Sequence, residues 1–185
     1  MAEDARIRKT KKKLSEALVA LLQEKAFRDI SPATLCERAG INRSTFYRNY
    51  KNTLQLKTEI EESILSGIYW DGKAKDTDEI REIIEKHLCY LGDNKPTFLA
   101  LSTPDFQENI FEKARRRAIR ASFEAFDRVE DAPEREEYEN LCTFYISALV
   151  TQVEDWFLGG MEQSIESLAS FLASRLSEAC EQIGA

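Results

Sequence analysis

The chain has little histidine, cysteine, glycine or proline. His87 is its only imidazole, which leaves too few partners for a catalytic triad or a metal site of several histidines. The four cysteines, Cys36, Cys89, Cys142 and Cys180, lie about forty or fifty residues apart and form no CxxC pair. This spacing argues against a zinc site and a disulfide framework, and it predicts reduced, buried thiols. With 7 glycines and 4 prolines in 185 residues, a many-stranded sheet with tight turns is disfavoured as well.

Long apolar runs are missing too. None approaches the roughly 20 residues that cross a membrane, and residues 1–13 carry charges where a secretory signal would have an apolar stretch. We therefore expect a cytoplasmic protein. The sequence has no glycine-rich phosphate loop and no cluster of metal ligands, so we expect neither an enzyme nor a bound cofactor or metal. A length of 185 residues suits one domain, or a small module fused to a larger one.

Charge is distributed unevenly along the chain. Residues 1–51 contain 12 Lys and Arg against 6 Asp and Glu, whereas residues 52–185 contain 14 against 27. A basic head therefore precedes an acidic body, and the formal net charge is −7. A polyanion would be attracted to the head and repelled by the body. Taken alone, the run Lys9, Lys11, Lys12 and Lys13 favours a solvated face on the first helix, so the motif that follows it decides the interpretation.

The head has the pattern of a helix-turn-helix. Apolar residues spaced three, four and seven apart predict a helix over residues 6–25. Ser31 is a preferred N-cap and Pro32 suits a first helical turn, so we expect a second helix to begin there. Gly40 is expected to end that helix in the left-handed conformation, which glycine adopts readily.

A third short helix carries the most informative residues. Asn42 is its expected N-cap, the helix is predicted over residues 43–50, and a fourth helix follows over residues 53–69. Phe46 and Tyr50 are four apart and can face the core. The side chains left mostly outside are Arg43, Ser44, Thr45, Tyr47, Arg48 and Asn49. Arg can hydrogen-bond guanine, Asn can hydrogen-bond adenine, and hydroxyls can hold phosphates, so this surface favours DNA over a polar helix without a partner.

The stretch over residues 30–56, ISPATLCERAGINRSTFYRNYKNTLQL, resembles the DNA-binding domain of the tetracycline-repressor (TetR) family of bacterial regulators. The match is close at Ala39–Ile41, Ser44–Tyr47 and Tyr50–Asn52. The resemblance implies a homodimer in which residues 1–52 form a helix-turn-helix DNA-binding domain and residues 53–185 form a ligand-binding and dimerisation domain. It also implies a repressor that binds a near-palindromic operator in double-stranded DNA and releases it when a small-molecule effector binds the body.

The same resemblance assigns roles to single residues. The positions expected to contact DNA are Ser31, Arg43, Ser44, Thr45, Tyr47, Arg48, Asn49 and Lys51. Tyr47 matches the family's aromatic residue that contacts phosphate, and Lys51 lies at the junction to the fourth helix, near the DNA backbone. Two residues further on the family commonly has a Lys that contacts phosphate, whereas this chain has Thr53. A hydroxyl or a helix N-terminus can still hold a phosphate there.

The body is predicted to be helical throughout, which makes the fold class all-α with about nine helices. Its predicted helical segments cover residues 76–91, 96–101, 105–129, 134–158 and 164–182. The helix over residues 134–158 is apolar on more than one side, so it needs a second covering partner. Together with the last helix it suits a four-helix dimer interface, although both could instead complete a single globule. Its segment FYISALVTQVEDWF also resembles a TetR subfamily that includes regulators of dihydroxyacetone kinase operons.

An effector pocket inside the body is implied by the resemblance alone. The candidate lining residues on inner helix faces are Tyr69, His87, Tyr90, Phe98, Phe111, Tyr145 and Trp156. Aromatic residues at helical spacing are typical of core packing, so packing competes with ligand binding at each position. The alternative to a DNA-binding regulator is a helical protein-interaction module whose basic head has no nucleic-acid partner.

Overall fold

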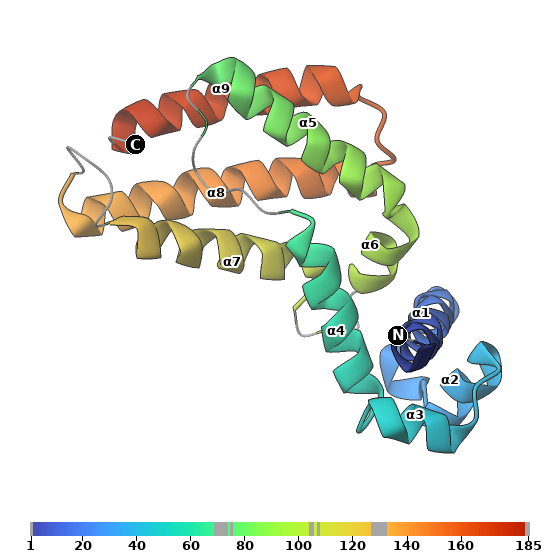
Figure 1. The fold of residues 1–185 in the computed structure, drawn as a ribbon. Helices are drawn as coiled ribbons and strands as arrows, with labels where there is room; N and C mark the ends of the chain where they lie inside the picture. Colours follow the sequence, from blue (N-terminus) through green and yellow to red (C-terminus); the bar gives the residue numbers. More distant parts are fainter. Residues whose placement is uncertain are drawn as a thin grey trace. The chain divides into compact units, whose positions relative to one another are not determined.

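The computed structural model describes residues 2–68, 74, 76–103, 106, 108–126 and 133–183, and these residues form helices without strands (Figure 1). In chain order the elements are α1 (Ala2–Leu22), a short 3-10 helix η1 (Phe27–Asp29), α2 (Pro32–Ala39), α3 (Arg43–Asn49), α4 (Thr53–Ser66), α5 (Thr77–Asp93), α6 (Lys95–Leu101), α7 (Ile110–Ala125), α8 (Arg135–Leu158) and α9 (Ile165–Ile183). The all-α fold class is confirmed. Within the described part of the chain, no helix is long and apolar enough to cross a membrane.

The chain forms two compact units. Unit 1 contains Met1–Gly67 and Lys95–Asn109, and unit 2 contains Ile68–Asn94 and Ile110–Ala185. Unit 1 therefore holds α1 to α4 together with α6, and unit 2 holds α5, α7, α8 and α9. The division by function at residues 52 and 53 stays a prediction, since it concerns what each part binds.

Local capping starts and ends the short helices of unit 1 as predicted. The Ser31 hydroxyl accepts a hydrogen bond from the Thr34 backbone N–H at 3.1 Å, and Pro32 occupies the first turn of α2. Gly40 ends α2 at φ 62° and ψ 38°, the left-handed conformation. The Asn42 carboxamide oxygen then accepts from the backbone N–H of Ser44 at 3.0 Å at the start of α3.

The core of unit 1 is built on α1, which packs against α2, α4 and α6. Its buried face comprises Leu14, Ala17, Leu18, Leu21 and Leu22, and Leu35, Phe46 and Leu56 from α2, α3 and α4 are fully buried as well. The helix ends at Leu22 instead of the predicted Lys25. The backbone N–H groups of Gln23 and Lys25 bond to Ala20 and Leu21 in a turn that directs the chain into η1.

The predicted helix over residues 105–129 was wrong at its start. The structure places α7 at Ile110–Ala125, while Phe106, Glu108 and Asn109 are outside any helix, and residues 104, 105, 107 and 127–132 lie outside the described part. Phe106 instead packs in unit 1, with its ring centroid 5.7 Å from that of Phe27. Helical spacing alone gave no sign that this apolar residue has tertiary partners in another element.

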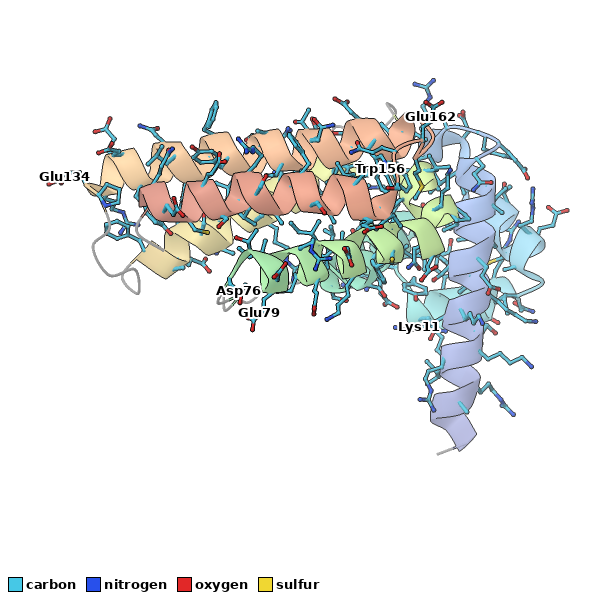
Figure 2. The ribbon with its side chains drawn as sticks, turned by 90° about the horizontal axis from the view of Figure 1, so that it is seen from above. Lys11, Asp76, Glu79, Glu134, Trp156 and Glu162 are labelled. Atoms are coloured by element: carbon cyan, nitrogen blue, oxygen red, sulfur yellow. The ribbon has the colours of Figure 1, made fainter. Side chains whose placement is uncertain are left out.

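The described residues of unit 2 form a layered set of helices, α5, α7, α8 and α9. α5 lies beside α9, α7 lies beside α8, and α8 also contacts α9 (Figure 1). Figure 2 shows Asp76 and Glu79 at the start of α5, where the Asp76 carboxylate accepts from the Glu79 backbone N–H at 2.9 Å. Trp156 lies near the end of α8, and its indole N–H donates to the carbonyl oxygen of Gln163 at 2.8 Å. This bond ties the loop between α8 and α9 to α8.

Candidate nucleic-acid interface

The third helix is anchored on one face and open on the other. Phe46 is completely buried and Tyr50, directly after the helix, is 2% exposed. The opposite face presents Arg43, Ser44, Tyr47 and Arg48, all exposed, with Thr45 and Asn49 partly buried beside them. Tyr47 is 57% exposed although its ring edge contacts Phe46 at 5.3 Å between centroids. The predicted inner and outer faces of this helix are therefore both present.

Three positive charges on or next to α3 remain available to a ligand. Arg43, Arg48 and Lys51 are exposed and form no ion pair with the part of the chain that the structure describes. The backbone N–H of Lys51 donates to the Gln55 side chain at 2.7 Å, which fixes the turn into α4. Thr53, where the resembling family commonly has a Lys, is the first residue of α4 and is partly buried.

Several of the predicted DNA-contacting side chains already form hydrogen bonds within the protein. The Ser31 hydroxyl caps α2, and the Ser44 hydroxyl donates to the Asn42 carboxamide oxygen at 3.0 Å. The Asn49 side-chain amide donates to the carbonyl oxygen of Thr45 at 2.8 Å. One hydrogen of that amide is therefore committed within α3, so a contact to adenine would use the remaining hydrogen and the carboxamide oxygen.

A carboxylate on α4 joins three parts of unit 1. Glu59 Oε1 accepts from the Tyr50 hydroxyl at 2.9 Å, and the Lys11 ammonium lies 3.0 Å and 2.8 Å from the two carboxylate oxygens. The same ammonium lies 5.4 Å from the centroid of the Tyr50 ring. Burial raises the pKa of the Tyr50 hydroxyl, and the neighbouring Glu59 carboxylate raises that pKa further. We refer to these three residues as the Glu59 cluster.

A second charged group lies inside unit 1. Lys57 and Glu61, one turn apart on α4, form an ion pair with side chains 5% and 3% exposed. The Lys57 ammonium lies 3.9 Å from the centroid of the Phe106 ring and 5.9 Å from that of Phe27. Neither of these two charged groups on α4 was predicted from the sequence. The spacing of Lys57 and Glu61 among apolar residues of α4 could have indicated the ion pair, whereas the bond from Lys11 to Glu59 spans 48 residues and leaves no local signal.

The candidate effector residues do not lie together in one compact unit. Phe98 is buried on α6 in unit 1, while the other described candidates belong to unit 2. Tyr69 lies outside the described residues. Phe111 packs on Phe157 with 5.6 Å between ring centroids, and the Tyr145 hydroxyl donates to the Gln182 side chain at 2.7 Å.

The remaining effector candidates also have defined surroundings. Trp156 is bonded to Gln163 as described above, and His87 and Tyr90 are partly buried on α5. Burial raises the pKa of the Tyr90 hydroxyl. A groove of about 450 Å³ in unit 1 is lined by other residues, namely Leu22, Gln23, Lys95, Pro96, Leu99, Ala100 and Thr103. No group of three or more His, Cys, Asp or Glu side chains among the described residues could hold a metal ion.

Comparison with known proteins gives a family match and several similar folds. A family model of the TetR C-terminal type, described as a transcriptional regulator C-terminal region, matches residues 78–177, which is more than half of the chain. No curated protein sequence matches the chain.

Solved structures of similar fold cover nearly the whole chain. A TetR transcriptional regulator from Streptococcus agalactiae has a TM-score of 0.65 at 21% identity, over 94% of this chain and 97% of that one. A transcriptional regulator from Aquifex aeolicus has a TM-score of 0.58 at 21% identity, over 91% and 98%. The dihydroxyacetone kinase operon activator DhaS has a TM-score of 0.58 at 19% identity, over 94% and 96%. At these identities the likeness establishes the fold, including a helix-turn-helix head and a helical body.

Proposed function

Since this chain belongs to the TetR family of transcriptional regulators, we propose that it binds duplex DNA with α3 in the major groove. The observation that supports this most strongly is the exposed face of α3, which carries Arg43, Tyr47 and Arg48 on a helix anchored from behind by Phe46. Arg43 is assigned to a base edge, since an Arg at the start of a recognition helix can bind guanine with two hydrogen bonds. Tyr47 and Lys51 are assigned to phosphate oxygens, which position the helix without selecting a sequence.

The remaining predicted DNA contacts have a supporting part in this proposal. Ser44 and Thr45 lie in the first turn of α3 and would contact phosphate or a base edge together with Arg43. Arg48 and Asn49 lie one turn further along, and Ser31 lies at the N-terminus of α2, which can face the DNA backbone. Thr53 begins α4 and would hold a phosphate through its hydroxyl or through the helix N-terminus.

We further propose a homodimer formed through α8 and α9. Phe144 on α8 is 67% exposed and Phe171 on α9 is 49% exposed, and Leu158 at the end of α8 is 49% exposed. Large apolar side chains exposed on two neighbouring helices are typical of a surface that a second subunit covers. Two heads related by a twofold axis would bind a near-palindromic operator, with half-sites about 34–36 Å apart.

The proposed activity is repression that a small molecule relieves. A dimer on an operator blocks access to the promoter, and an effector that prefers a different conformation of the body lowers the affinity for DNA by the ratio of its affinities for the two conformations. The effector candidates in this proposal are His87, Tyr90, Phe111, Tyr145 and Trp156 in unit 2 and Phe98 on α6 in unit 1. DhaS shares the fold and is described as an activator, so a promoter–reporter assay must establish the sign of regulation.

The decisive test is selection of a duplex from random sequence by the purified full-length protein, followed by affinity measurements over a range of salt concentrations. Binding should weaken steeply with salt, because each phosphate contact contributes about 0.9 to the slope of log K against log salt. Arg43→Ala should lower the affinity by a factor of about 10 to 100 and relax the selected sequence at one position. Arg120→Ala removes an exposed Arg from unit 2 and is the matched control, expected to bind like the wild type.

Two results would overturn the assignment. Failure to select any duplex would favour a helical protein-interaction module. Selected binding that is equally weakened by Arg43→Ala and Arg120→Ala would place the interface away from α3.

A further inference from the structure

We propose that Glu59 is a positioning residue for DNA recognition, which holds the C-terminal end of α3 against α1 and α4 through Tyr50 and Lys11. The inference rests on the proposed function and goes beyond it, since Glu59 lies on α4, away from the exposed face of α3, and need not touch DNA. Its proposed effect is on the orientation of the α3 residues that contact DNA.

The geometry of the Glu59 cluster supports this role. Tyr50 is the C-cap residue of α3 and its backbone N–H bonds to the Phe46 carbonyl at 2.9 Å. Its hydroxyl, buried with the ring, donates to Glu59 on α4 at 2.9 Å. Lys11, labelled in Figure 2, lies on α1 and bonds to both oxygens of the same carboxylate. One side chain thus connects the end of α3 to two longer helices.

A short helix needs such a second attachment. α3 has seven residues, and Phe46 is its one buried side chain. A helix held at one buried residue can still rotate about that point, which would move Arg43 and Arg48 relative to a base edge. The buried ring and hydroxyl of Tyr50 fix a second point next to the last turn, and hydrogen-bonded side chains inside a protein restrict such rotation because an unsatisfied buried hydroxyl is costly.

The ion pairing of Lys11 within the Glu59 cluster differs from that of its neighbour Lys12 on α1. Lys11 has a side chain 37% exposed and is paired with a carboxylate from another helix. The Lys12 side chain is 78% exposed and, within the part of the chain that the structure describes, pairs with Glu16 on its own helix, at 3.8 Å. A lysine that contacts phosphate contributes to the salt dependence of binding. Lys11 is already neutralised by Glu59, so in this proposal it affects affinity through the orientation of α3 and leaves the salt slope unchanged.

The test compares full-length variants on a duplex selected by the wild-type protein and on a random-sequence duplex of equal length. Tyr50→Phe removes the hydroxyl without changing charge and should lower affinity for the selected duplex about fivefold, with unchanged affinity for the random duplex. Glu59→Gln should lower the selected affinity about three- to tenfold, although the loss of a negative charge by itself favours binding to DNA. Glu16→Gln removes the same charge from a pair within one helix and should bind the selected duplex at least as tightly as the wild type.

Two further measurements distinguish positioning from a loss of folding or of a phosphate contact. A variant that is partly unfolded loses selected and random binding in the same proportion, so the ratio of the two affinities reports orientation. Lys11→Gln should lower that ratio with an unchanged salt slope, whereas Lys51→Gln, at a proposed phosphate contact, should reduce the slope by about 1.

The outcomes separate this inference from the function on which it rests. If the wild-type protein selects no duplex, the proposed function fails. If the wild type selects a duplex but Tyr50→Phe and Glu59→Gln keep the ratio shown by Glu16→Gln, the positioning role of Glu59 is refuted and DNA binding stands. A reduced ratio in both variants, with Lys11→Gln leaving the slope unchanged, supports the role.

Discussion

Replacing Lys57 by Met is predicted to destabilise the protein by several kcal/mol, about 3–5. The side chains of Lys57 and Glu61 are 5% and 3% exposed, so the ion pair between them is removed from water almost completely. The ammonium also lies 3.9 Å from the centroid of the Phe106 ring. Lys57→Met keeps an unbranched side chain of similar length, so the change removes mainly the charge.

The magnitude follows from this burial. Loss of one partner from a buried ion pair costs about 3–5 kcal/mol, because the remaining charge stays in a medium of low dielectric. The lost cation–π contact with Phe106 accounts for about 0.5–2 kcal/mol of that total. The double variant Lys57→Met with Glu61→Met removes both charges and should recover at least half of the loss, since apolar replacements of buried pairs are often near neutral.

Urea denaturation followed by far-ultraviolet circular dichroism measures these differences. All variants should be compared at one protein concentration, because the stability of a dimer depends on concentration. The reasoning would be refuted if Lys57→Met lay within about 1 kcal/mol of the wild type. It would also be refuted if the double variant lost as much as the two single variants together.

Three further predictions concern other parts of the molecule. Gly40→Ala should cost about 1 kcal/mol in the free energy of unfolding, purely through the left-handed backbone, because a Cβ there meets no atom within 4 Å; an unchanged urea midpoint would contradict this. Phe144→Glu should shift the proposed dimer toward monomer in sedimentation velocity, and a persisting dimer would place the interface elsewhere. The hydrogen bond from the Arg38 guanidinium lowers the pKa of the Glu24 carboxyl below its ordinary value. The pair therefore stabilises the fold above the ordinary pKa of a glutamate, and this stabilisation is lost as the pH falls through the lowered pKa. The melting temperature of Glu24→Gln should therefore fall less than that of the wild type on acidification, and equal falls would contradict the assignment.

Features that depend on neighbours in the sequence could be predicted well. The caps at Ser31 and Asn42 and the left-handed Gly40 are determined by residues within one turn, and the structure confirms all three. The two faces of α3 follow from helical spacing in the same way. The spacing of apolar residues along the sequence is enough to determine which side chains share one face of a single helix.

Features that depend on distant partners could not be predicted. Phe106 has the spacing of a helical residue, but its contacts with Phe27 and Lys57 keep it in unit 1, outside α7. Glu59 looks like any exposed acidic residue until Lys11 and Tyr50 are placed beside it. Such side chains acquire their role from tertiary packing, which overrides local propensity.

The effector candidates could not be assigned from the sequence because helical spacing does not distinguish core packing from the lining of a pocket. Helical spacing marks an inward face, but an inward aromatic can either pack against a neighbour or line a cavity. Phe111 packs on Phe157, and Phe98 belongs to a different compact unit from Tyr90. To distinguish the two roles, the positions of the neighbouring side chains must be known, and the spacing of residues along a helix does not give them.

A hydroxyl-radical footprint of the full-length protein on its selected duplex tests the role of α3 most directly. We predict two protected patches on one face of the duplex, centred about one helical turn apart, as expected for two recognition helices in successive major grooves. Arg43→Ala should weaken both patches together. Absence of protection, or protection that Arg43→Ala leaves unchanged, would contradict DNA binding through this helix.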